Sequence, residues 1–146
     1  MQTIATIDSI LHHKGPQVWC ISPDKTVFEA IQMLAEKNIG ALPVIEDGKV
    51  IGVFSERDYT RKVALAGKNS KSTRVREIIS MDVISVTPDS SVEECMRLMT
   101  EHRIRHLPVC QDGALVGLIS IGDLVNWTIS MQSAALDQME SYLAGR

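Results

Sequence analysis

The chain has 146 residues, 45% of them hydrophobic and 23% charged, values typical of a globular protein that folds without a disulfide or a structural metal. The formal net charge of −3 provides no basic surface for nucleic acid. No apolar run reaches the ~20 residues that cross a bilayer, and the N-terminus carries Asp8 instead of a basic start followed by an apolar stretch. We therefore expect no signal peptide, no membrane or nucleic-acid partner, and a cytoplasmic location.

The first half of the chain is predicted to form a β-α-β-β-α unit after a short leading helix at 4–11. An apolar run at 18–21 predicts a strand, and Ser22-Pro23-Asp24 opens a helix with apolar residues at helical spacing. Strands are predicted at 42–45 and 50–54, joined by a tight turn at Asp47-Gly48, because glycine supplies the positive φ that such a turn needs. A second helix begins near Ser55.

The same order recurs after a polar linker at 67–74. Residues 23–59 align with residues 88–124 at a constant offset of 65 without a gap, which indicates two structurally equivalent units. A short helix at 75–79, strands at 83–86, 107–110 and 115–119, and a helix from Ser120 follow from that alignment. The identical pairs include Pro23/Pro88, Asp24/Asp89, Leu42/Leu107, Pro43/Pro108, Val44/Val109, Asp47/Asp112, Gly48/Gly113, Ser55/Ser120 and Asp58/Asp123.

These elements divide the chain into a first unit at 1–66, the linker at 67–74, a second unit at 75–130 and a helical tail at 131–146. A longer amphipathic helix is predicted over 124–143, and a terminal helix of this kind has to bury its apolar face. We expect it to pair with a second copy of the chain. Its apolar stripe consists of Leu124, Trp127, Met131, Ala135, Met139 and Tyr142.

The three cysteines, Cys20, Cys95 and Cys110, have an odd count and no C-x-x-C spacing, which argues against a disulfide framework or a zinc site. We predict that all three pack in the core, with a redox role for Cys20 left open. Adjacent His12 and His13 point apart on a helix, so no metal site is predicted.

The most informative local motif is G-V-F-S-E-R-D at 52–58, with its copy G-L-I-S-I-G-D at 117–123. In each copy a strand ends and a helix begins at the serine. The N–H groups at a helix N-terminus suit a phosphate, and an ionised aspartate accepts hydrogen bonds from a ribose diol. The alternative is that S-x-x-D caps the helix, and the two roles are compatible.

The ordered set of motifs resembles the tandem CBS-domain pair, named after cystathionine β-synthase, in its stand-alone bacterial form. The matching stretches are I-G-A-L-P-V-I-E-D-G-K-V-I-G-V-F-S-E-R-D and I-R-H-L-P-V-C-Q-D-G-A-L-V-G-L-I-S-I-G-D. The resemblance implies an α/β (α+β) fold in which two units are related by a pseudo-two-fold axis, with their sheets packed together and helices at both ends. It also implies a homodimer and an adenosine ligand: AMP, ADP, ATP, NAD or S-adenosylmethionine.

In that family each cleft is assembled from both units. Carried over to this chain, the first site combines Ser55 and Asp58 with Thr87, Ile104, Arg105 and His106. The second site combines Ser120 and Asp123 with Ser22, Ile39, Gly40 and Ala41.

Charge distinguishes the two predicted sites. Arg105 and His106 stand where the first unit has Gly40 and Ala41, and Arg57 is replaced by glycine in the second unit. Because a guanidinium matches a phosphate with a planar fork of donors, we predict that the first site favours the more anionic ligand. The alternative for Arg57 and Arg105 is a solvated surface charge.

Together these features predict a regulatory sensor that binds an adenosine nucleotide and signals by conformational change to a partner protein in trans. No Ser/His/Asp, metal or phosphate-loop pattern is present, so no catalytic residue is predicted. The alternatives are a structural dimerisation scaffold without a ligand and an enzyme acting on a nucleotide.

Overall fold

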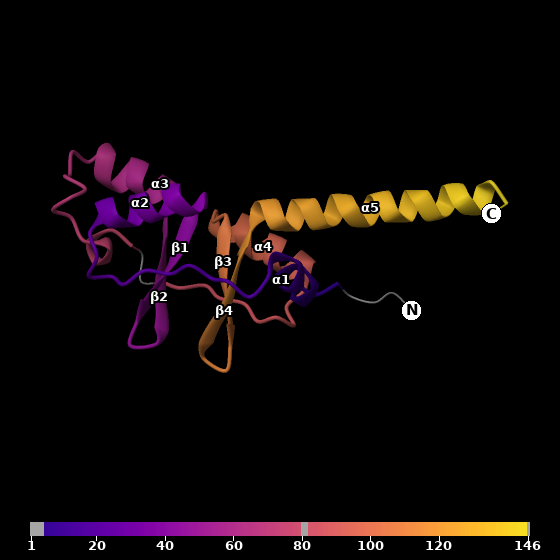
Figure 1. Cartoon of the computed structure of the whole chain (residues 1–146), viewed down its shortest axis with the longest axis horizontal. Coiled ribbons are helices and arrows are strands. Elements are labelled where there is room, and N and C mark those ends of the chain that lie inside the picture. The colour runs from indigo at the N-terminus through magenta and orange to yellow at the C-terminus, as the bar shows by residue number, and fades with distance from the viewer. Residues whose placement is uncertain (1–4, 80–81, 146) are drawn as a thin grey trace.

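The computed structural model describes residues 5–79 and 82–145, which form two α/β units lying side by side (Figure 1). The elements in chain order are α1 (Asp8–Lys14), α2 (Val27–Lys37), β1 (Ala41–Glu46), β2 (Lys49–Ser55), α3 (Glu56–Asp58), the π-helix η1 (Tyr59–Ala64), the 3₁₀ turn η2 (Val75–Glu77), α4 (Val92–His102), β3 (His106–Gln111), β4 (Ala114–Ser120) and α5 (Ile121–Leu143).

Local sequence signals set the helix starts and the hairpin turns. Thr26 caps α2 and Ser91 caps α4, each accepting a hydrogen bond from the backbone N–H three residues later. The turn residues Asp47, Gly48, Asp112 and Gly113 all have positive φ, the backbone of a tight hairpin turn. The predicted hairpins are therefore confirmed as two antiparallel pairs, β1–β2 and β3–β4.

The strands predicted at 18–21 and 83–86 are wrong in extent. Each is reduced to a single parallel bridge, Ile21 with Val44 and Val86 with Val109. Each pairing ends at once because the next residues, Ser22-Pro23 and Thr87-Pro88, begin a turn and proline has no N–H to donate.

The two short segments that precede the units exchange places in the fold. Ile7 and Ile10, around α1, are buried in the core of the second unit, with Leu107 and Ile119. In return, Val75 of η2 is buried in the core of the first unit. The segments are equivalent, since the N–H of Val92 donates to the carbonyl of Ala5 and that of Val27 donates to the carbonyl of Thr73. The exchange ties both units together, and β2 contacts both β3 and β4. Position 4 of the predicted leading helix lies outside the described residues.

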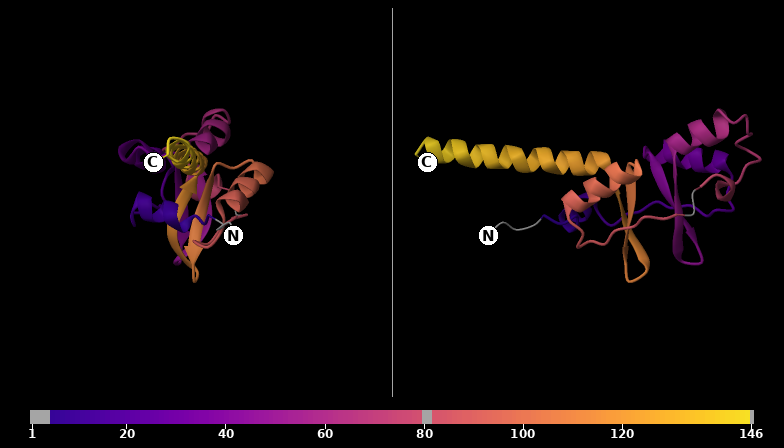
Figure 2. Two further views of the ribbon diagram at one scale, coloured as in Figure 1. Left: turned by 90° about the vertical axis from the view of Figure 1, so that its right-hand side faces the viewer. Right: turned by 180° about the vertical axis from the view of Figure 1, so that it is seen from behind.

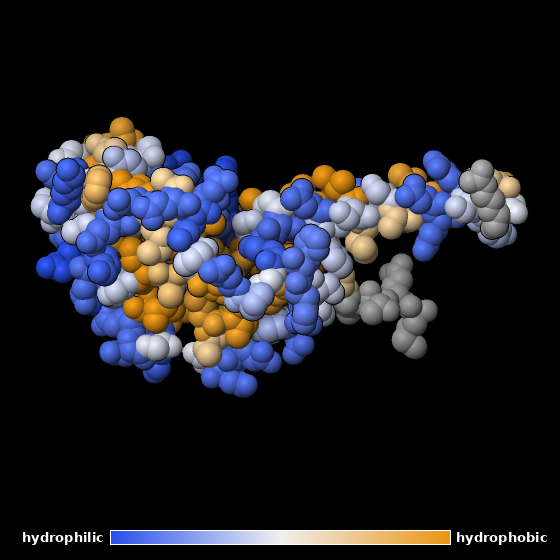
Figure 3. All heavy atoms as spheres, in the orientation of Figure 1, coloured by the Kyte–Doolittle hydropathy of each residue, from blue (hydrophilic) through white to orange (hydrophobic). Residues whose placement is uncertain are grey.

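The last helix of the second unit and the tail form one continuous helix, α5. Leu124 is buried and Trp127 packs against the second core, but the rest of α5 extends away from both units (Figures 1 and 2). Met131, Met139 and Tyr142 of the predicted stripe are consequently exposed, and Figure 3 shows hydrophobic atoms along this part of the helix. Among the described residues, no helix combines the length and apolar character needed to span a membrane.

Candidate functional site

The S-x-x-D motifs form helix caps in both units. The N–H of Ser55 donates to Asp58 Oδ2 at 2.9 Å, and the N–H of Asp58 donates to Ser55 Oγ at 3.2 Å. Ser120 and Asp123 repeat this pair of bonds at 2.9 and 3.1 Å. The capping role is therefore confirmed. Because it uses only one carboxylate oxygen, Oδ2, of each aspartate, Oδ1 of Asp58 is left beside its neighbour Lys62, 3.3 Å away.

The backbone donors at the two helix starts are largely used inside the protein. The N–H of Glu56 donates to the carbonyl of Gly40 at 3.1 Å, and the N–H of Ile121 donates to the carbonyl of Arg105 at 2.9 Å. These bonds fix each serine motif against the start of β1 or β3. Anion recognition by helix N–H groups, as predicted from the motif, is thus weakened, and side-chain cations become the main candidates.

One cavity of about 830 Å³ lies where the two units meet. Of the first predicted set, Ser55, Arg57, Asp58, Ile104, Arg105 and His106 line it. Thr87 does not appear in its lining and lies beside Ser90, with 3.4 Å between the two hydroxyl oxygens. The preceding segment, Asp82–Ile84, lines the cavity instead.

Four basic residues that the sequence analysis missed also line this cavity: Arg61, Lys62, His102 and Arg103. Arg61 and Lys62 lie four residues after Arg57 and Asp58, a helical spacing that was a readable signal. Within the described part of the chain, the guanidinium groups of Arg57, Arg61, Arg103 and Arg105 form no ion pair or hydrogen bond. Glu56, Asp58 and Asp82 also line the cavity, but its basic side chains outnumber these carboxylates, which favours an anionic occupant.

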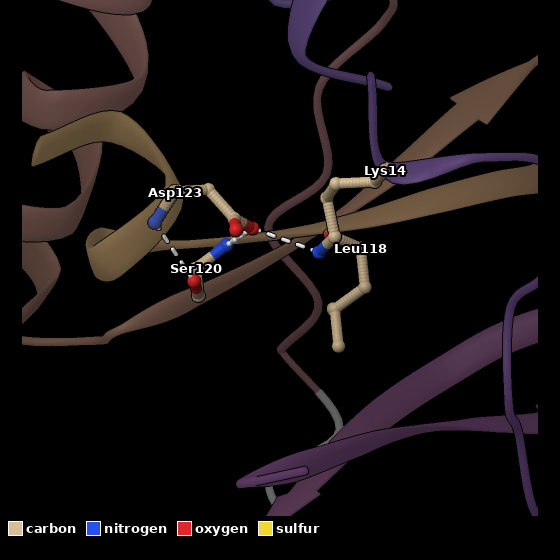
Figure 4. A network of polar contacts seen from close by, with 4 residues as sticks. All are labelled: Lys14, Leu118, Ser120 and Asp123. Carbon is tan, nitrogen blue, oxygen red and sulfur yellow. Dashed lines mark hydrogen bonds and ion pairs between the residues drawn. The ribbon is translucent and has the colours of Figure 1, made fainter. Parts of the chain in front are cut away.

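The second predicted set is arranged differently. Gly40 and Ser120 line the first cavity, whereas Ala41 is buried in β1 and Ser22 is exposed at the turn before α2. Ile39 packs against the first core. Asp123 accepts a hydrogen bond from Lys14, whose Nζ lies 2.8 Å from Oδ2 (Figure 4).

His106 connects the two regions. A Cβ on Gly40 would lie 3.6 Å from two atoms of the His106 ring, so the ring packs directly over this glycine. Burial is the main cause that lowers the pKa of His106 below its usual 6.5. The positive charges of Lys14 and Arg105 lower it further, while Asp123 opposes them.

The cysteines differ in environment. Cys95 is fully buried as predicted, and burial raises the pKa of its thiol to about 11. Cys110 is partly buried, and the core prediction for Cys20 is wrong because that residue is exposed just before the single bridge at Ile21. Among the described residues, no group of three histidine, cysteine or carboxylate side chains is arranged to hold a metal ion.

The comparisons with known proteins agree with the two-unit architecture. The family model "CBS domain" matches residues 11–65 and again residues 75–130. The chain is 37% identical to a mitochondrial CBS domain-containing protein of Arabidopsis thaliana, CBSX3, over 96% of this chain and 72% of that protein. A solved CBS-domain protein from Burkholderia ambifaria has 47% identity and a TM-score of 0.82, covering 86% of this chain and 95% of that one.

A third match concerns the fold alone. It is a solved CBS domain pair in complex with 5′-methylthioadenosine and S-adenosyl-L-methionine. Its identity to this chain is 23%, with a TM-score of 0.77 over 88% of this chain and 99% of that one. The family match, found twice along the chain, and the structural matches over most of its length lead to one conclusion: the chain belongs to the CBS domain family.

Proposed function

We propose that the chain is a regulatory module that binds an adenosine nucleotide in the cavity between its two units, with ATP and ADP preferred over AMP and NAD. CBS domain pairs are commonly regulatory ligand-binding modules, and CBS domains bind adenosine-containing ligands. The observation that carries the choice of ligand is the set of four unpaired guanidinium groups around one cavity, joined by Lys62 and the half-buried His106. A ligand with several phosphates neutralises more of this charge than a monophosphate.

Each part of the ligand has a matching group in the cavity. Oδ1 of Asp58, which the helix cap does not use and which lies 3.3 Å from Lys62, accepts hydrogen bonds from the ribose hydroxyls, since an ionised carboxylate is only an acceptor. Arg57, Arg103 and Arg105 hold the phosphates. Backbone groups beside Ile104 read the adenine.

The signal arises because the cavity is lined by both units. A ligand that contacts Ser55 on one side and Ile104 on the other shifts the balance between two arrangements of the units, by no more than its difference in affinity for them. A separate partner protein receives this change in trans, in the cytoplasm. No residue is assigned a catalytic role.

A second copy of the chain is the proposed partner of α5. Five of its exposed apolar residues follow the alternating spacing of three and four that defines the seam of a coiled coil, with Gln132 at the one remaining seam position. These residues are Val125, Ile129, Leu136, Met139 and Leu143.

A melting-temperature panel with AMP, ADP, ATP, NAD and S-adenosylmethionine tests the ligand proposal. A ligand that binds only the folded state raises the melting temperature as its concentration increases, and we expect ATP and ADP to give the largest shifts. Arg57→Gln and Arg105→Gln should each weaken ATP binding by about 10- to 100-fold, from the ~1.5–3 kcal/mol of a hydrogen bond to a charged group. AMP binding should change less.

Arg97→Gln is the matched control, because Arg97 pairs with Glu101 on the surface of α4 and does not line the cavity. It should leave the ATP affinity unchanged. No shift with any ligand would favour the scaffold alternative. Turnover of ATP that disappears in Asp58→Asn would favour the enzyme alternative.

A further inference from the structure

A lysine from the far end of the chain holds the second S-x-x-D motif. Lys14 is the last residue of α1, and its Nζ donates to Asp123 Oδ2 at 2.8 Å and to the carbonyl of Leu118 at 2.7 Å (Figure 4). The side chain of Asp123 is 21% exposed and that of Lys14 is 40% exposed, so the carboxylate is largely shielded while the ammonium stays in partial contact with solvent.

The repeat identifies the positions in the first unit that are equivalent to these two acceptors. At the offset of 65, Asp123 matches Asp58 and Leu118 matches Val53, and both Asp58 and Val53 line the first cavity. Lys14 therefore binds, in the second unit, the positions that face the ligand cavity in the first. Lys62 contacts Asp58 differently, from the next turn of the same helical segment, and its hydrogen bond goes to the carbonyl of Ile78 instead of the strand.

Packing anchors Lys14 in this place. Ile10 of α1 is buried in the second core, and the side chain of Leu11 lies against Gly117 of β4, where a Cβ would come within 2.5 Å of it. The corresponding segment before the second unit forms only the three-residue turn η2, whereas α1 has seven residues. Lys14, the last residue of this helix, is the basic side chain that reaches the second motif.

We infer that Lys14 determines how many nucleotides each chain binds. Its ammonium binds Asp123 as an internal cation, so that the second site rejects a nucleoside. Each chain therefore binds one nucleotide, at the first cavity. This inference rests on the proposed function. Through Oδ2 the ammonium neutralises the carboxylate that would otherwise accept the ribose hydroxyls, and it also occupies the carbonyl of Leu118 on the adjacent strand. A nucleoside could enter only by displacing the Lys14–Asp123 ion pair.

Calorimetric titration of the full chain with ATP and with AMP tests this inference. The wild-type protein should bind one equivalent of ATP, lost in Asp58→Asn. Lys14→Met keeps the length of the side chain without its charge, and it should bind a second equivalent of AMP, roughly tenfold or more tighter than any second site of the wild type. Adding Asp123→Asn should remove that second equivalent. Lys14→Arg should behave as the wild type, and so should Lys49→Met in the first hairpin.

The outcomes separate the two proposals. If the wild type binds no adenosine nucleotide, the proposed function fails. If ATP binds at the first cavity but Lys14→Met still binds a single AMP, or if the wild type already binds two equal ligands, only the inference about Lys14 fails. The pKa of His106, followed by NMR without any ligand, checks that Lys14→Met has folded with the ammonium removed. This pKa should rise in the variant, because the positive charge of Lys14 lowers it. An unchanged pKa would also overturn the inference.

Discussion

Asp58 and Asp123 make the same helix cap but have different cations as neighbours. Asp58 has Lys62 from its own helical segment at 3.3 Å and lines an arginine-rich cavity, whereas Asp123 is held at 2.8 Å by Lys14 from another element. An identical S-x-x-D motif thus lines a cavity in one unit and is held by a lysine from a distant element in the other. For a single residue, the amino-acid type does not determine its role until the neighbouring side chains are known.

His106 links the two environments and makes folding stability depend on pH. Its pKa in the folded protein is lowered, chiefly by burial, while the unfolded chain has the usual value of 6.5. Between these two values the unfolded state binds more protons, so the contribution of this residue to stability is fully present above pH 6.5 and is lost as the pH falls through the folded pKa.

We therefore expect the free energy of unfolding to rise with pH in the window just below 6.5, and this part of the slope to disappear in His106→Gln. Urea unfolding of both proteins at a series of pH values measures the difference. A steeper slope in His106→Gln would contradict the assignment.

Among the elements, α1 packs against residues that are far from it in the sequence. It precedes the first unit and packs into the second, where Ile7 is fully buried. Its partner in the exchange, η2, does the reverse with Val75. Each short element therefore stabilises the unit that it does not precede.

Ile7→Ala tests this exchange. Removing a buried isoleucine side chain should lower the free energy of unfolding by about 2–5 kcal/mol. Amide hydrogen exchange should show the first loss of protection in β3 and β4. Leu65→Ala, at a side chain that is 79% exposed at the end of η1, should change stability by less than about 0.5 kcal/mol. Loss of protection confined to β1 and β2 would show that α1 packs on the unit it precedes.

The second element whose role depends on its surroundings is α5. Leu136→Glu places a charge in the middle of the exposed seam and should convert a dimer to a monomer of 16.1 kDa, measured by light scattering. Ala134→Glu carries the same charge on the opposite side of the helix and should remain dimeric. An unchanged mass for Leu136→Glu would exclude α5 as the dimer interface.

On the scale of the whole molecule, the cavity exists only because the two units meet. Ser55 and Arg57 come from one unit and Ile104 and His106 from the other, so neither unit alone has a complete lining. The exchanged segments add further connections between the same units. A ligand in this position would contact both units at once.

The amino-acid sequence by itself determined the duplication, the hairpins at Asp47-Gly48 and Asp112-Gly113, and the serine caps, because each depends on residues a few positions apart. It also led to the family and to eight of the residues that line the cavity. Only the tertiary structure placed Lys14 on Asp123, 109 residues away, and Arg103 in the cavity. Contacts of this kind leave no local pattern, since they depend on the length of α1 and on which core it packs against.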